Sequence, residues 1–218
     1  SEEMLPYAGI LQAVLGIIDT NNYEYGELFN EINVHTGGIG TSLELYPNVE
    51  KVKEKEFRAT FEIKTKALYG KLPVAFRMMQ EILTESKLTD ERRLKEILSM
   101  AKSRLQMRFQ SSGHTTAALR AMSYASPLSK LKDLTSGIGY YEIVKQIEEH
   151  FEEEKDTLIK NLQTLTKLLF RPENMMVSYT AAREGMEGLE KLVSELKAKL
   201  FTEPVQGLSL IHISSPRD

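Results

Sequence analysis

Apolar residues recur at helical spacing along most of this chain. The first stretch begins after Pro6, which suits the first turn of a helix because no N–H donor is needed there. Its apolar positions, three and four residues apart, are Tyr7, Ile10, Leu11, Val14 and Ile18. The pattern predicts an amphipathic, core-facing helix over residues 6–18, weakened in its last turn by Gly16. The polar residues 19–22 are expected to cap a second helix over residues 25–32.

Apolar stripes at the same spacing predict that most of the chain beyond residue 70 is helical. Clusters of serine, glycine and proline separate the stripes. The predicted helices span residues 74–83, 89–109, 115–124, 140–151, 158–169 and 189–200, with a short helical piece between positions 127 and 136. Two methionine pairs, Met78 with Met79 and Met175 with Met176, are expected to fill the core because methionine adapts to irregular gaps.

Three other stretches alternate between apolar and polar residues, which is the period of a strand. They are residues 39–45, 57–67 and 175–179, and the second alternates most regularly. One face of that strand is expected to be buried and the other wet, as in an antiparallel sheet covered by helices on one side. The order of elements predicts a helix-rich α+β fold of two layers rather than a parallel βαβ array. A charged turn or hairpin is expected over residues 47–56.

Length and composition narrow the class of protein. A chain of 218 residues can form one large domain or two small ones. Its net charge of -3 provides no electrostatic footprint for nucleic acid or an anionic membrane, so neither partner is expected. No cysteine is present, which rules out disulfides and thiolate chemistry. No apolar run approaches the roughly 20 residues of a membrane helix, and no basic leader opens the chain, so a cytoplasmic location is expected.

The residues alone offer little catalytic chemistry. Residues 5–46 contain no nucleophile with a base beside it and no phosphate-binding loop. Glu31 and His35 are four residues apart and could place two ligands on one helical face. The favoured interpretation is a polar histidine near a helix end, where a cation suits the helix dipole. His114 is likewise interpreted as part of a helix entrance.

Two further patterns have both a functional and a structural interpretation. His150 lies within helical reach of Glu153 and Glu154, so weak metal binding is conceivable. A solvated acidic face is favoured, because no second histidine is near to complete a ligand set. The glycine-rich residues 37–40 follow a helix and precede a strand, the reverse of the order that a phosphate loop requires. They are interpreted as a helix stop that allows close backbone approach.

A family resemblance extends this interpretation. The sequence YEYGELFNEINVHTGGI at residues 23–39, in its order of helix, helix, glycine pair and strand, resembles the presequence-protease branch of the pitrilysin or insulinase metallopeptidases. The resemblance implies a long polypeptide of two similar halves, each of two α+β domains, which close around a peptide. In that family only the first half is catalytic. It carries an inverted HxxEH motif, in which two histidines bind zinc and the glutamate activates water.

Residues 9–13 lie where the resemblance places that motif. Gly9 and Ala13 stand at the two histidine positions and Gln12 at the glutamate position. A catalytic zinc needs three protein ligands, and an amide cannot serve as a base. No other register restores a ligand pair, because residues 5–16 contain no His, Asp or Glu. The resemblance therefore implies a degenerate motif, no catalytic or metal-binding residue in this chain, and zinc only in the parent enzyme.

The implied function is that of an inactive third domain, which forms a chamber wall and helps to hold an unfolded peptide. The catalytic half of the same polypeptide and the peptide substrate are the expected partners. The residues that carry the resemblance are expected to fix the second helix and partly face the chamber, with packing favoured over substrate contact. They are Tyr23, Tyr25, Glu27, Asn30, Glu31, Gly37 and Gly38.

The resemblance also predicts the organisation of the chain. Residues 1–203 are expected to form one domain that lacks its first strand, so the chain is expected to be a fragment. Residues 204–218 have no helical period and resemble translated adaptor sequence, although a genuine disordered tail stays open. Two other functions also stay open. One is a standalone, inactive structural subunit with the same fold. The other is a helical interaction module, which requires the strand at residues 57–67 to be unpaired.

Overall fold

The computed structural model of this chain describes residues 2–47 and 57–204. The charged turn expected at residues 47–56 lies outside the described residues, except for Pro47. The tail expected at residues 204–218 also lies outside them, except for Pro204.

Helices dominate the described part of the chain, and one antiparallel pair of strands accompanies them. The α-helices are α1 (Leu5–Val14), α2 (Tyr25–His35), α3 (Leu72–Thr84), α4 (Glu91–Ser111), α5 (Gly113–Ser123), α6 (Pro127–Ser136), α7 (Ile138–Glu149), α8 (Phe151–Leu169) and α9 (Leu189–Lys199). The strands are β1 (Ile39–Pro47) and β2 (Phe57–Thr65), and short 3-10 turns are η1 (Glu2–Met4), η3 (Tyr69–Lys71), η4 (Pro172–Asn174) and η5 (Arg183–Met186). The fold is the helix-rich α+β class that the pattern predicts.

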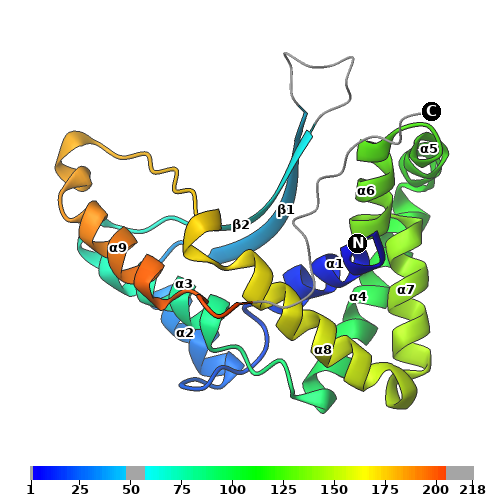
Figure 1. The fold of residues 1–218 in the computed structure, drawn as a ribbon, viewed down its shortest axis with the longest axis horizontal. Helices are drawn as coiled ribbons and strands as arrows, with labels where there is room; N and C mark the ends of the chain where they lie inside the picture. The colour runs from blue at the N-terminus through cyan, green and yellow to red at the C-terminus, as the bar shows by residue number, and fades with distance from the viewer. Residues whose placement is uncertain (1, 48–56, 205–218) are drawn as a thin grey trace.

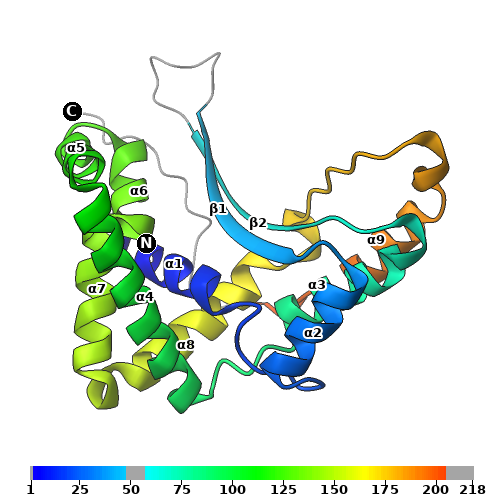
Figure 2. The same cartoon turned by 180° about the vertical axis from the view of Figure 1, so that it is seen from behind.

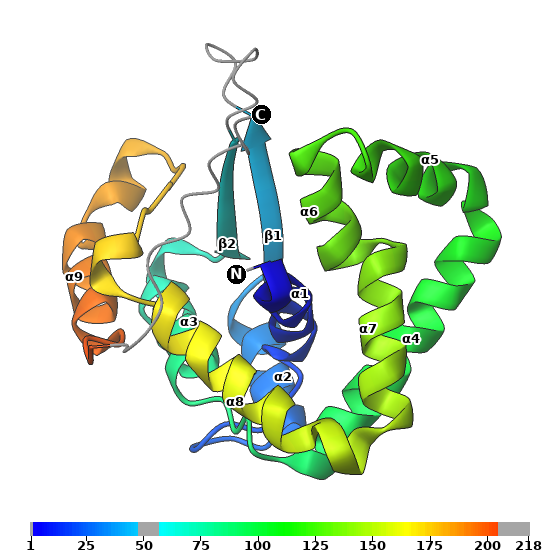
Figure 3. The same ribbon diagram turned by 45° about the vertical axis from the view of Figure 1, so that its right-hand side comes forward.

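Helix α1 lies at the centre of this arrangement. It contacts α4, α6, α7 and α8 as well as strand β1. The hairpin β1–β2 stands with α4 to α7 on one side and α3 and α9 on the other, while α8 runs beneath it along α1 (Figures 1 and 3). The view from behind shows α2 beside α3, below the base of the hairpin (Figure 2).

The burial of α1 differs from the prediction of a single apolar face. Four consecutive residues, Ala8 to Leu11, are buried, and four consecutive positions span the whole circumference of a helix. The helix also ends at Val14 rather than at residue 18, because Gly16 adopts a positive φ of 86° just beyond it. Ile18 is nevertheless fully buried, so the apolar positions are core residues although the helix stops earlier.

The hairpin has one apolar and one polar face, as the alternating pattern predicts, but the apolar face is half-buried rather than buried. Leu43 pairs with Phe61 and Thr41 with Ile63 on the apolar face. The ring of Phe61 packs edge-on against Phe170 at the end of α8, with 5.2 Å between ring centroids. Because residues 57–65 pair in a sheet, the alternative of a purely helical interaction module is wrong.

The strand predicted at residues 175–179 is wrong. In the described chain these residues form a connection between η4 and η5 without pairing to another strand. Alternation alone cannot make a strand, because an extended segment needs a neighbour to accept its backbone hydrogen bonds. Met176 is 70% exposed and is therefore not core filler, whereas Met78 and Met79 are buried as expected.

Arg93 ties α4 to the segment that follows α1. Its guanidinium donates hydrogen bonds of 3.0 Å and 2.8 Å to the carbonyl oxygen of Ile17. It pairs with Glu96 at 3.1 Å, and its Cζ atom lies 3.9 Å from the ring centroid of Tyr25 in α2. One largely buried cation thus joins three separate segments.

The polar face of the hairpin centres on Glu62. Its carboxylate accepts hydrogen bonds from Tyr46 at 2.6 Å and from Thr60 at 2.9 Å, and it pairs with Lys64 at 2.8 Å. The hydrogen bonds from Lys64, then Tyr46 and Thr60, lower the pKa of Glu62 to about 2. The ionised carboxylate therefore stabilises the hairpin at neutral pH.

Replacing Arg93 by alanine should destabilise the fold by about 1.5–3 kcal/mol, because hydrogen bonds from a charged group and a cation–π contact are lost together. Its neighbour Arg92 has a 90% exposed side chain that pairs with Glu96, so Arg92→Ala should cost about 0.5 kcal/mol or less. Urea unfolding of both variants measures the difference. Equal effects would contradict the role given to Arg93.

Replacing Glu62 by glutamine should destabilise the protein at pH 7. Because the folded pKa is depressed, the contribution is present above the unfolded pKa of about 4.3 and is lost as the pH falls toward about 2. Urea unfolding of the parent and of Glu62→Gln at several pH values should therefore converge across that window. A carboxyl titration of Glu62 by NMR with a midpoint near the unperturbed value would refute the network.

Candidate functional site

The degenerate motif lies on α1, which contacts four other helices and strand β1. Gly9 is buried against α6 and α7, whereas Gln12 and Ala13 are half-buried. The backbone carbonyl of Gln12 accepts a hydrogen bond of 3.0 Å from the Thr41 hydroxyl, which joins α1 to the hairpin. The structure therefore uses this turn of α1 for packing against its neighbours.

The residues of this motif do not fit a zinc ion. Gly9 and Ala13 have no ligating side-chain atom, and the amide of Gln12 cannot act as a base. Beside Gly9 stands the ring of Tyr140, and burial raises the pKa of its phenol. Within residues 2–47 and 57–204, no three histidine, aspartate or glutamate side chains gather closely enough to hold a metal ion.

Hydrogen bonds join the loop before α2 to the end of α3. Asn22 donates to both carboxylate oxygens of Glu81, through its amide at 3.1 Å and 3.0 Å. The Asn21 amide donates to Glu85 at 2.6 Å, and Thr20 pairs with Ser86 in an isolated β-bridge. The run 19–22 therefore caps α2 through Asp19, whose carboxylate accepts a hydrogen bond of 2.8 Å from the N–H of Tyr25, and it also clasps α2 to α3.

The family-motif residues in α2 and in the loop before it have different surroundings. Tyr23 is half-buried and its N–H donates to the Thr20 hydroxyl at 3.1 Å, whereas Tyr25 stacks on Arg93. Glu27 accepts a hydrogen bond of 3.3 Å from the N–H of Glu24 at the start of the helix. Asn30 is exposed. Sequence reasoning missed Arg93 and Glu81, because nothing in the local pattern of α3 or α4 indicates which distant residue each contacts.

The end of α2 positions the glycine pair against β2. The N–H of Gly37 donates to the Lys66 carbonyl at 2.7 Å, and a Cβ atom there would collide with the Lys66 side chain. Gly38 has a positive φ of 96°, and its carbonyl accepts from the Thr65 hydroxyl at 2.9 Å. The two glycines thus let the chain turn sharply from α2 into β1.

The three histidines of the described residues, His35, His114 and His150, lie in separate segments. His35 lies 3.5 Å from Glu31 through Nε2, and its Nδ1 atom is buried without a hydrogen-bond partner among the described residues. His114 is exposed in α5, and exposed His150 separates α7 from α8, where its carbonyl accepts from the N–H groups of Glu153 and Glu154. These contacts are those of helix ends.

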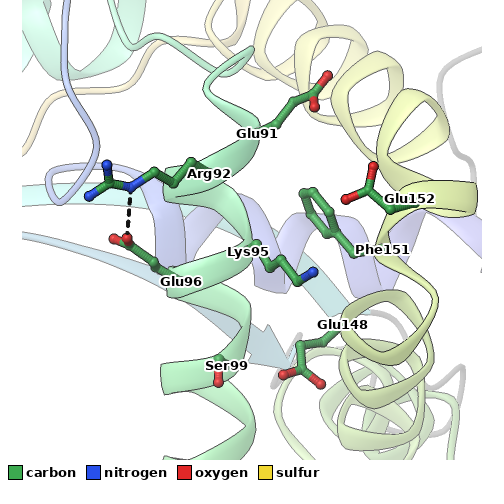
Figure 4. A pocket seen from close by; sticks show the side chains of 8 residues that line it. All are labelled: Glu91, Arg92, Lys95, Glu96, Ser99, Glu148, Phe151 and Glu152. Carbon is green, nitrogen blue, oxygen red and sulfur yellow. Dashed lines mark hydrogen bonds and ion pairs between the residues drawn. The ribbon is translucent and has the colours of Figure 1, made fainter.

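An open pocket of about 520 Å³ lies between α4 and the junction of α7 with α8 (Figure 4). Its carboxylates are already paired: Glu91 and Glu152 lie 2.8 Å and 3.1 Å from Lys155, and Glu148 pairs with Lys102. These pairs raise the pKa of Lys155 to about 12 and raise the pKa of Lys102. Ser99 carries the single hydroxyl among the lining residues, and none of these residues is a histidine. The pocket therefore offers no set of catalytic groups. It is lined by Glu91, Arg92, Lys95, Glu96, Ser99, Glu148, Phe151 and Glu152.

No helix in the described part of the chain has the length and apolar composition that crossing a membrane requires.

Comparison with curated proteins finds relatives along nearly the whole chain. Protein HypA of Clostridium perfringens is 33% identical over 198 residues, which is 91% of this chain and 20% of that protein. Presequence protease 1 of Arabidopsis thaliana, named as chloroplastic and mitochondrial, is 25% identical over 94% of this chain and 19% of its own length. The mitochondrial presequence protease of Drosophila melanogaster is 31% identical over 74% of this chain and 15% of its own length.

The chain thus spans about a fifth of the length of the relatives that it matches. A family model matches residues 1–147, which include α1, the hairpin and most of α7. Its description is that of a domain associated with subfamily C of the M16 peptidases. By this match the chain belongs to that peptidase-associated family, which is related to the presequence proteases.

Proposed function

We propose that this chain is the non-catalytic domain of a zinc-dependent metalloendopeptidase that degrades unfolded peptides inside a closed chamber. It forms one wall of the chamber and supports peptide binding, while the catalytic half of the same polypeptide holds the zinc. The observation that carries the proposal is the chemistry of α1, where Gly9, Gln12 and Ala13 supply neither a zinc ligand pair nor a base.

The relatives support this division of labour. The alignment with HypA covers 91% of this chain but only 20% of HypA, and the Arabidopsis alignment has similar proportions. The catalytic residues, the zinc and the peptide-cleaving activity are therefore assigned to the remainder of a longer polypeptide. The cytoplasmic location stays a prediction from the sequence.

The outer face of α2 supports a contact with another part of such a polypeptide. Three large apolar side chains are exposed on this short helix: Tyr25 at 46%, Phe29 at 58% and Val34 at 72%. Tyr25 and Phe29 lie about one turn apart on one face, whereas Val34, nine residues after Tyr25, lies on the opposite side of the helix. The exposed apolar face of Tyr25 and Phe29 is typical of a surface that a partner covers, and we assign the catalytic half as that partner.

The chain alone should neither bind zinc stoichiometrically nor cleave an unfolded peptide. The measurement is zinc content after dialysis against micromolar zinc, together with mass spectrometry of a peptide incubated with the chain. A full-length presequence protease is the positive control. One zinc per chain accompanied by peptide cleavage would refute the inert-domain proposal.

A standalone structural subunit would also be inactive, so the gene must separate the two functions. A continuous reading frame that carries an HxxEH helix several hundred residues upstream supports the proposed domain. A natural start near Met4 and a stop near Phe201 support the subunit instead.

A further inference from the structure

Gly9 lies at a tight contact between three helices. A Cβ atom at this position would be 2.7 Å from the carbonyl oxygen of Thr135 in α6 and 2.8 Å from Cε2 of Tyr140 in α7. Both separations are shorter than a carbon atom tolerates without displacement of its neighbours. The absence of a side chain at Gly9 is therefore a requirement of the packing.

The two neighbours have little freedom to move away. The obstacle from Thr135 is a backbone atom inside α6, so no side-chain rotation relieves it. Tyr140 is only 6% exposed, and it lies two residues after the first residue of α7. Tyr140 therefore belongs to the first turn of α7, and the position of this turn holds its ring beside Gly9.

Asp133 fixes the first turn of α7. Its buried carboxylate accepts hydrogen bonds from the N–H groups of Ile138 at 3.0 Å and Gly139 at 3.2 Å. Arg120 of α5 neutralises it at 2.6 Å. A Cβ atom at Gly139 would meet this carboxylate at 2.8 Å, so the turn between α6 and α7 is as closely packed as the contact at Gly9.

We infer that the position of the first zinc ligand in the family motif is here a packing contact between α1, α6 and α7, which excludes an imidazole and prevents reconstruction of a zinc site by restoring the motif residues. The packing part of this inference depends only on the structure. The zinc part rests on the proposed function, because it uses the alignment of α1 with the HxxEH helix.

The first test compares two glycines within helices. Gly→Ala inside a helix ordinarily raises stability, because alanine has the higher helix propensity. Gly26 of α2 has open space around its missing Cβ, so Gly26→Ala should leave the melting temperature unchanged or raise it. Gly9→Ala should lower it by about 3–10 °C because the added methyl overpacks the contact. A melting temperature unchanged by Gly9→Ala would overturn the inference.

The second test restores the motif in two stages. Gln12→Glu with Ala13→His leaves Gly9 in place and, because both positions are half-buried, should lower the melting temperature less than the triple variant does. Adding Gly9→His should lower the melting temperature strongly, or abolish cooperative unfolding, without creating a site that retains one zinc per chain. A triple variant that melts near the parent temperature and retains one zinc after dialysis would overturn the inference.

The outcomes separate this inference from the proposed function. If Gly9→Ala is neutral, the packing contact is refuted, while the unmodified chain can still lack zinc and peptidase activity. If the unmodified chain binds zinc and cleaves peptides, the proposed function fails, whatever the effect of the alanine substitution.

Discussion

Burial of α1 on every side is the constraint on which the rest of the structure depends. Ile10, Leu11 and Val14 have essentially no exposed surface, and the helix contacts four other helices and the hairpin. A helix in that position gains the free energy of removing its apolar surface from water. It can tolerate an ionisable side chain only if that group finds a partner inside the protein. Residues 5–16 contain no charged side chain, which meets this condition.

The same constraint explains why this domain has few candidate catalytic groups although specific contacts join its segments. In the proposed role the domain contributes shape, because its polar side chains are used to join segments to each other. Asn22 and Glu81 clasp α3 to the loop before α2, and Asp133 holds the turn between α6 and α7. Such contacts fix how these segments are arranged relative to one another.

Local pattern was sufficient for much of the fold because helical stripes and strand alternation report burial directly. The stripe at residues 89–109 corresponds to α4, and the alternation at residues 57–67 corresponds to β2. The local pattern failed where the boundary of an element or the partner of a side chain depends on residues far away in the sequence. Phe151 extends the stripe of α7, yet it opens α8 after a break at His150. The contacts of Arg93 with Ile17 and of Asn22 with Glu81 join residues 76 and 59 positions apart, and no periodicity shows them. The alternation at residues 175–179 misled because no pairing strand lies beside it in the described chain.

The most direct test of this account is amide hydrogen exchange of α1, followed by mass spectrometry with and without zinc. If α1 is a central packing helix, its amides should exchange only through global unfolding, as slowly as the most protected amides of the chain. Zinc should then leave that protection unchanged. Rapid local exchange in α1 that slows when zinc is added would contradict the account.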